Sequence, residues 1–155
     1  ELEYVKAYLF IIKCRYGDSF SCKTEVRNPE ALDYMVPRLI IQPIIENAVE
    51  HGRNSSNDGF VSLVIEGGKH ANDDLRIIVT NQGEPSEESM KKIHALLNDS
   101  TEEQVHASQI GIRNVNRRLK MLYSDASGLT IEPDGHGNTI STIIVKKSQA
   151  QQFKL

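Results

Sequence analysis

Apolar residues recur at steps of three and four over residues 1–16, which predicts a helix with a wide apolar face. Alternating apolar and polar residues predict a strand over 19–26. A second helix is expected over 37–52, where isoleucine, alanine and valine supply a broad apolar face and Gly52 is a natural stop. Pro43 removes one backbone hydrogen bond from a helix interior, so this helix either begins close to Pro43 or kinks there.

The rest of the chain shows the same two periodicities in alternation. We expect two strands joined as a hairpin, at residues 60–65 and 75–79, and then a helix at 86–97. A loop at 99–109, a helix at 111–123 and two further strands at 129–131 and 139–145 should follow. The loop is long enough to suggest a function of its own. This order of elements predicts an α+β fold, a two-layer sandwich in which helices cover one face of a mixed, antiparallel-leaning sheet.

Composition places the chain among ordinary globular domains. It has 155 residues, 39% apolar and 25% charged, with a net charge of −3. This balance disfavours dedicated nucleic-acid binding, and the sequence contains no apolar run of membrane-spanning length and no signal-peptide pattern. Cys14 and Cys22 have no metal-binding spacing and are expected to be reduced thiols of a cytosolic protein. Because the chain begins without Met, we expect it to be part of a longer protein.

Of the four polar clusters that carry candidate chemistry, the first lies within the second helix and the second lies at the end of the second hairpin strand. Asn47 and His51 share one face of an isoleucine-rich helix, and the Asn47 amide oxygen suits Mg²⁺ unless that residue is merely capped or solvated. Asn81 offers the acceptor and donor needed to read a purine edge, and Gly83 would admit a flat ring. The alternative for Asn81 and Gly83 is an ordinary turn after a strand.

The other two clusters lie nearer the C-terminus. At 109–114 the predicted loop enters a helix through Gly111, and the N–H groups of a helix N-terminus attract anions. The alternative is a basic, solvated helix face. At 135–139 two glycines and the Thr139 hydroxyl suit a turn beside a phosphate, or else form a plain hairpin. Phosphate-loop, Rossmann, zinc-protease and hydrolase-elbow motifs are absent from the sequence.

In this order the clusters resemble the ATP-binding domain shared by histidine kinases, gyrases and Hsp90-type chaperones, and most closely that of sensor histidine kinases of the LytS/YesM type. Residues 37–52, PRLIIQPIIENAVEHG, resemble the N box of that family, and residues 110–119, IGIRNVNRRL, resemble its second glycine box. Residues 1–20 resemble the segment that joins the phosphoacceptor helices to the ATP domain in these kinases.

The resemblance implies a Bergerat-type fold that binds ATP and Mg²⁺. Asn47 would hold Mg²⁺ against the phosphates, Asn81 stands where the family usually has an adenine-reading aspartate, and residues 99–109 would form the mobile lid. Glu46 is a candidate catalytic residue that would orient water or an incoming imidazole. The implied ATP-binding set is Asn47, His51, Asn81, Gly83, Ile110, Gly111, Ile112, Asn114 and Thr139.

The resemblance also implies an organisation and a set of partners. Residues 1–16 would be a connector helix from a phosphoacceptor domain outside this chain, residues 17–147 the histidine-kinase-like ATPase domain, and residues 148–155 a polar tail. The partners would be the protein's own phosphoacceptor helical domain, which holds the target histidine, and a response regulator. We expect a homodimeric full-length protein in the bacterial cell membrane, with this domain in the cytoplasm.

Two other functions are consistent with the sequence. Asn81 lacks the charge of the family aspartate, and Pro85 and Gln109 replace glycines of the family pattern. These changes would suit a degenerate, non-catalytic nucleotide-binding or regulatory module of the same fold. If the resemblance is set aside, the apolar face of residues 1–16 would be a helical dimer contact in an interaction protein.

Overall fold

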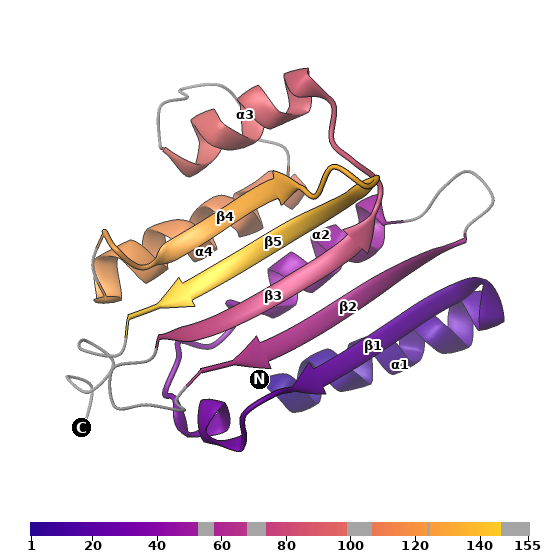
Figure 1. Ribbon diagram of the computed structural model, residues 1–155, viewed down its shortest axis with the longest axis horizontal. Helices are drawn as coiled ribbons and strands as arrows, with labels where there is room; N and C mark the ends of the chain where they lie inside the picture. The colour runs from indigo at the N-terminus through magenta and orange to yellow at the C-terminus, as the bar shows by residue number, and fades with distance from the viewer. Residues whose placement is uncertain (53–57, 68–73, 99–106, 124, 147–155) are drawn as a thin grey trace.

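A computed structural model of the chain describes residues 1–52, 58–67, 74–98, 107–123 and 125–146, with the backbone alone at 107–109 (Figure 1). The helices are α1 (Leu2–Tyr16), α2 (Gln42–His51), α3 (Glu87–Leu97) and α4 (Ala107–Tyr123), with 3₁₀ turns η1 (Gly17–Ser19) and η2 (Pro29–Asp33). The strands are β1 (Phe20–Val26), β2 (Gly59–Glu66), β3 (Leu75–Gln82), β4 (Gly128–Pro133) and β5 (Asn138–Val145).

The five strands form one sheet in the order β1-β2-β3-β5-β4. β1 pairs with β2 in parallel, and the other neighbours pair antiparallel. Figure 1 shows α1, α2 and α4 on the same face of the sheet, while α3 lies beyond the β4 edge. The predicted two-layer α+β fold with a mixed, antiparallel-leaning sheet is therefore confirmed.

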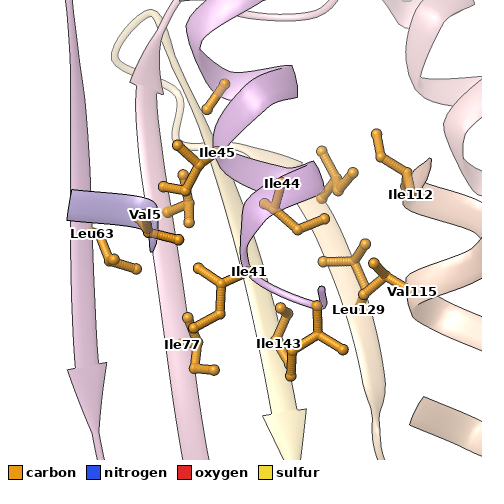
Figure 2. Close-up of a cluster of buried hydrophobic side chains, with 14 of the residues drawn as sticks. Val5, Ile41, Ile44, Ile45, Leu63, Ile77, Ile112, Val115, Leu129 and Ile143 are labelled. Atoms are coloured by element: carbon orange, nitrogen blue, oxygen red, sulfur yellow. The ribbon is translucent and has the colours of Figure 1, made fainter. Parts of the chain in front are cut away.

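The core lies between the sheet and its helical layer. Alternate residues of β2, β3, β4 and β5 are buried toward the helices, among them Leu63, Ile77 and Ile143 (Figure 2). The apolar faces of α2 and α4 meet them, with Ile44 and Val115 almost fully buried. Because strand side chains alternate with a period of two and helix side chains recur every 3.6 residues, these sequence patterns place one apolar face of each element in a single core.

Two helices begin at residues other than those predicted. α2 begins at Gln42, so Pro43 lies in its first turn, where the missing N–H costs no helical bond and no kink is needed. α4 begins at Ala107, four residues before the predicted start at Gly111. Gly111 consequently lies in the second turn, where backbone N–H groups bond within the helix rather than pointing freely from its end.

The first helix packs as part of the helical layer. Val5, Leu9 and Ile12 of α1 are buried, and α1 contacts β1 and α2. Its origin as a connector from a phosphoacceptor domain remains a prediction. The predicted tail at 148–155 and the predicted hairpin connection at 68–73 lie outside the described residues. None of the helices within the described ranges has the length and apolar character needed to cross a bilayer.

A buried amide joins α4 to two neighbouring elements. Asn116 is 4% exposed; its Nδ2 donates to the Leu97 carbonyl at 2.7 Å, and its Oδ1 accepts from the Leu129 N–H at 2.9 Å. The end of α3 and the start of β4 are thus held against the same side chain. Both backbone groups depend on the Asn116 amide for these bonds.

Replacing Asn116 with alanine should lower the free energy of unfolding by about 1–2 kcal/mol, because a buried carbonyl and a buried N–H lose their partners. The adjoining pocket, about 300 Å³ in volume, moderates the loss by admitting water to the freed groups. Urea unfolding measures the change, with Asn98→Ala at the exposed end of α3 as the control. Equal stability of the two variants would contradict the bridging role.

Candidate functional site

A pocket of about 270 Å³ lies between α2, α3, α4 and the adjoining ends of β3 and β5. Six of the residues that the sequence predicted for ATP binding line it: Asn47, His51, Asn81, Gly83, Ile112 and Thr139. They come from four elements and from the turn after β3. The fold therefore gathers into one cavity residues that are far apart along the chain.

α2 supplies one wall of the pocket because it is amphipathic. Ile44, Ile45, Ala48 and Val49 are buried toward the core, while the half-buried Asn47 lines the pocket. His51 lies one turn further along the same face and is exposed at the pocket edge. The neutral amide of Asn47 is thereby placed on the pocket side of a helix whose other side is fixed in the core.

The opposite wall is the end of β3. Asn81 is 2% exposed, and its Nδ2 donates to the Gln82 carbonyl at 2.8 Å. The Asn81 amide still has an oxygen acceptor and a second N–H, which is the pair that can match a purine edge.

Gly83 joins this wall to β5. It has a φ of 98°, a conformation that favours glycine, and a Cβ there would lie 3.1 Å from the His51 carbonyl oxygen. Its N–H donates to the Gly137 carbonyl at 2.9 Å, and its carbonyl accepts from the Thr139 hydroxyl at 2.6 Å. Thr139 is thus fixed at the pocket, with its hydroxyl proton directed to Gly83.

The turn that leads to Thr139 is held by one carboxylate. Asp134 accepts hydrogen bonds from the Asn138 side chain, from the His136 N–H and from the Asn138 N–H. These bonds, chiefly that of the Asn138 side chain, lower the pKa of Asp134 below its usual range. Since a carboxylate with a depressed pKa stabilises the fold above its unfolded pKa, the turn should loosen only as the pH falls through the folded pKa.

Three of the predicted ATP-binding residues, all on α4, lie outside this pocket. Gly111 and Asn114 line a separate groove of about 480 Å³ between the start of α2 and α4. Ile110 is 47% exposed and lines neither cavity. These residues differ from Ile112 because α4 already begins at Ala107, so that they project from other sides of a formed helix. The predicted lid falls mostly on residues 99–106, which lie outside the described residues.

Glu46, the candidate catalytic residue, is directed away from the pocket. Its side chain is exposed and accepts from the Gln42 Nε2 at 2.8 Å. Burial raises the pKa of the Tyr8 hydroxyl on α1, and the charge of Glu46 is the next cause of that shift. Glu46 therefore lies on the side of α2 that faces α1.

One wall of the pocket was missed in the sequence. α3 contributes Ser89, Lys92, Ile93 and Leu96. Their spacing of three, one and three marks a single helix face, and the sequence prediction of a helix over 86–97 assigned that face no binding role. Lys92, whose Nζ lies 2.6 Å from Glu88 Oε1, brings a cation to the pocket. Apart from Glu84 and His51, the other described residues that line the pocket have uncharged side chains.

Changing Asn81 to aspartate, the residue usual in the resembling family, should destabilise the nucleotide-free domain by about 1–2 kcal/mol. An ionised carboxylate cannot donate to the Gln82 carbonyl and would set an acceptor against it. Thermal unfolding at pH 7 measures the change. Gln82→Glu, one residue further along β3 and less buried, is the control. Unchanged or higher stability of the Asn81→Asp variant would show that the amide donor contributes nothing.

Comparison with known proteins gives the chain its relatives. No family model matches it. It is 31% identical over 155 residues to the sensor histidine kinase/phosphatase LytS of the bacterium Staphylococcus aureus, a match that covers 98% of this chain and 25% of LytS. The chain thus spans about a quarter of the length of these curated relatives.

Solved structures agree on the fold. The nucleotide-free catalytic domain of histidine kinase ThkA superposes with a TM-score of 0.63 at 18% identity, covering 94% of this chain and 90% of that one. ThkA in complex with the response regulator TrrA superposes with a TM-score of 0.62 at 15% identity, and the match covers 97% of this chain and 40% of the ThkA chain. The resemblance identified in the sequence is confirmed: the chain is a relative of LytS-type sensor histidine kinases and has the fold of a histidine-kinase catalytic domain.

Proposed function

We propose that this domain binds Mg-ATP in the pocket between α2 and α3 and positions it for phosphoryl transfer to a histidine outside this chain. It would act as the catalytic domain of a two-component sensor histidine kinase. The observation that carries the proposal is the meeting of Asn47, Asn81, Gly83 and Thr139 in one pocket. The relationship to LytS supports the same function.

The base and the phosphates would occupy different ends of this pocket. Asn81 would pair with the adenine edge, and Gly83, which has no side chain, would let the ring approach the backbone. Thr139 would contact the nucleotide from β5. Lys92 on α3 would add positive charge for the phosphates. Phosphoryl transfer depends mainly on such positioning and on charge neutralisation.

The residues present fit a metal that arrives with the nucleotide. Within the described part of the chain no three His, Cys, Asp or Glu side chains cluster as a metal site. Asn47 offers one neutral amide oxygen to the pocket, which suits Mg²⁺ because that ion keeps several waters and takes its other ligands from phosphates. Bound Mg²⁺ would neutralise part of the phosphate charge.

Three further residues of the predicted ATP-binding set could contact ATP only if α4 began at a different residue. Ile110, Gly111 and Asn114 lie within the helix and away from the pocket. If α4 began near Gly111 when nucleotide is bound, free N–H groups would become available to the phosphates. We propose their contact with ATP only for that conformation.

The wider assembly follows from the same proposal. α1 would connect this domain to the protein's own phosphoacceptor helical domain, in a homodimeric protein anchored in the bacterial membrane with this domain in the cytoplasm. A response regulator would be the second partner, as TrrA is for ThkA.

Thermal unfolding with ATP tests the proposal directly. At about 100 times its dissociation constant, Mg-ATP should add about 2.7 kcal/mol of stability, which raises Tm by about 5–10 °C for a domain of this size. The shift should require Mg²⁺, and GTP should give a smaller one. Measurements without Mg²⁺ and with GTP are the controls.

A degenerate module of the same fold is the second candidate. Asn81 is neutral. Glu46, the residue of α2 that was proposed for catalysis, faces α1 rather than the pocket. If millimolar ATP gives no shift with or without Mg²⁺, this candidate replaces the first. A shift that Mg²⁺ does not alter would favour nucleotide binding without kinase chemistry.

A further inference from the structure

The helix that carries Asn47 has no side-chain cap of its own. The residue at its N-cap is Ile41, which makes no capping hydrogen bond, and Pro43 follows in the first turn. The first N–H groups of a helix need acceptors from elsewhere. Glu1 supplies one from forty residues away in sequence: its Oε1 accepts from the Ile41 N–H at 2.7 Å and from the Gln42 N–H at 3.2 Å.

The same residue begins α1. The Glu1 carbonyl accepts from the Val5 N–H at 3.2 Å, and Val5 is fully buried in the core. The second carboxylate oxygen, Oε2, is buried and has no hydrogen-bond partner. A carboxylate is favoured beside the positive end of a helix dipole, which offsets part of the cost of burying it there. Glu1 thus joins the first turns of α1 and α2.

The far end of α2 lies against Asn81 and Gly83, the residues of the pocket proposed to contact the base. A Cβ on Gly52, the residue that caps the helix C-terminus, would lie 3.0 Å from the Asn81 Cβ. The His51 carbonyl oxygen lies 3.1 Å from the corresponding position on Gly83. A shift or rotation of α2 that starts at its N-terminus would therefore move Asn47 and His51 relative to Asn81.

We propose that Glu1 is a positioning residue that couples the placement of α1 to the nucleotide pocket. Its carboxylate fixes the axial position and rotation of α2 and so fixes where Asn47 meets the phosphates. Movement of α1 would withdraw the acceptor from α2 and weaken nucleotide binding without any contact between Glu1 and nucleotide. The effect on nucleotide rests on the proposed function, whereas the coupling of the two helices does not.

The first test compares nucleotide affinity among folded variants. Calorimetric titration with Mg-ATP, at a temperature where every variant is folded, should give a dissociation constant about tenfold higher for Glu1→Ala. Glu1→Gln keeps an oxygen acceptor and should lose about threefold or less. Glu3→Ala is the matched control, because Glu3 is exposed on the same helix and forms an ion pair with Lys6 at the surface. If Glu1→Ala fails to fold, Glu1→Asp retains the charge but shortens the reach and takes its place.

The second test needs no nucleotide. Hydrogen exchange of the free domain should rise several-fold in Glu1→Ala at Asn47 and Val49 as well as at Ile41, and should stay unchanged in Glu3→Ala. Faster exchange limited to Ile41 and Gln42, or unchanged Mg-ATP affinity in a binding-competent protein, would overturn the coupling and leave Glu1 as a cap alone. If the wild-type domain binds no Mg-ATP, the proposed function fails, and hydrogen exchange still decides the coupling.

Discussion

Asn47→Ala should abolish Mg²⁺-dependent ATP binding while leaving the domain folded. Asn47 is the one residue of α2 with a side-chain amide that lines the pocket, and within the described residues no acidic cluster could hold the metal in its place. Without that oxygen, Mg-ATP should bind at least about 100-fold more weakly, since metal and phosphates lose the same anchor. Titration calorimetry with and without Mg²⁺ measures the loss.

Stability separates this loss of function from a loss of fold. Asn47 is half-buried and lies outside the apolar face of α2, so its truncation should change the free energy of unfolding by less than about 0.5 kcal/mol. Glu46→Gln is the matched control on the neighbouring residue. Because the Glu46 carboxylate faces α1, we expect its affinity for Mg-ATP to equal that of the wild type. Undiminished affinity in Asn47→Ala would remove the metal-binding assignment.

The Asn47 wall of the pocket was predictable because its signal is local. An amide in the middle of an isoleucine-rich helix is unusual enough to require an explanation, and His51 shares its face by helical periodicity alone. Asn81 and Gly83 stand at the end of an apolar strand, where a polar pair marks the boundary of the core. Each of these positions follows from its immediate neighbours in sequence.

Other features depend on contacts between distant segments. The face of α3 that contains Ser89 and Lys92 has the same spacing as a core face, and only its position beyond the β4 edge makes it a pocket wall. β1 has the alternation of any half-buried strand, so its parallel pairing with β2 is set by the α2 crossover between them. Glu1 caps α2 only because α1 begins beside it. No pattern within one segment of the sequence predicts these contacts between distant segments.

The predicted start of α4 was wrong for a different reason. Residues 107–110 lack a strong apolar period, and Gly111 suggested a helix boundary. The helix nevertheless extends back to Ala107. A single glycine within a helix costs only about 1 kcal/mol relative to alanine. The burial of Ile112, Val115 and Leu119 offsets this cost, so the helix continues through Gly111.

A second large effect is expected at the contact between two glycines. A Cβ on Gly59, the first residue of β2, would overlap the Gly52 carbonyl oxygen and lie 3.2 Å from the Phe20 ring. Gly59 is also paired in register with Phe20 of β1. The end of α2 and the start of β2 can approach this closely only without a side chain at that point.

Gly59→Ala should therefore lower the free energy of unfolding by about 3 kcal/mol, because backbone on both sides must move to accommodate the methyl group. The expected fall in Tm is about 6–12 °C, read by thermal unfolding. Gly17→Ala is the control, since within the described part of the chain no atom beyond its chain neighbours lies within 4 Å of that Cβ and only the backbone conformation, with a φ of 63°, opposes alanine; it should cost about 1–2 kcal/mol.

The same substitution should also weaken nucleotide binding among the molecules that remain folded. Gly52 packs on Asn81, and His51 packs on Gly83, so displacement of the end of α2 would open the wall of the pocket that Asn81 and Gly83 form. We expect about a tenfold loss of Mg-ATP affinity in Gly59→Ala and none in Gly17→Ala. Wild-type stability of Gly59→Ala would show that α2 is not held against β2 at this contact. Wild-type affinity in a destabilised variant would show that the contact supports the fold without shaping the pocket.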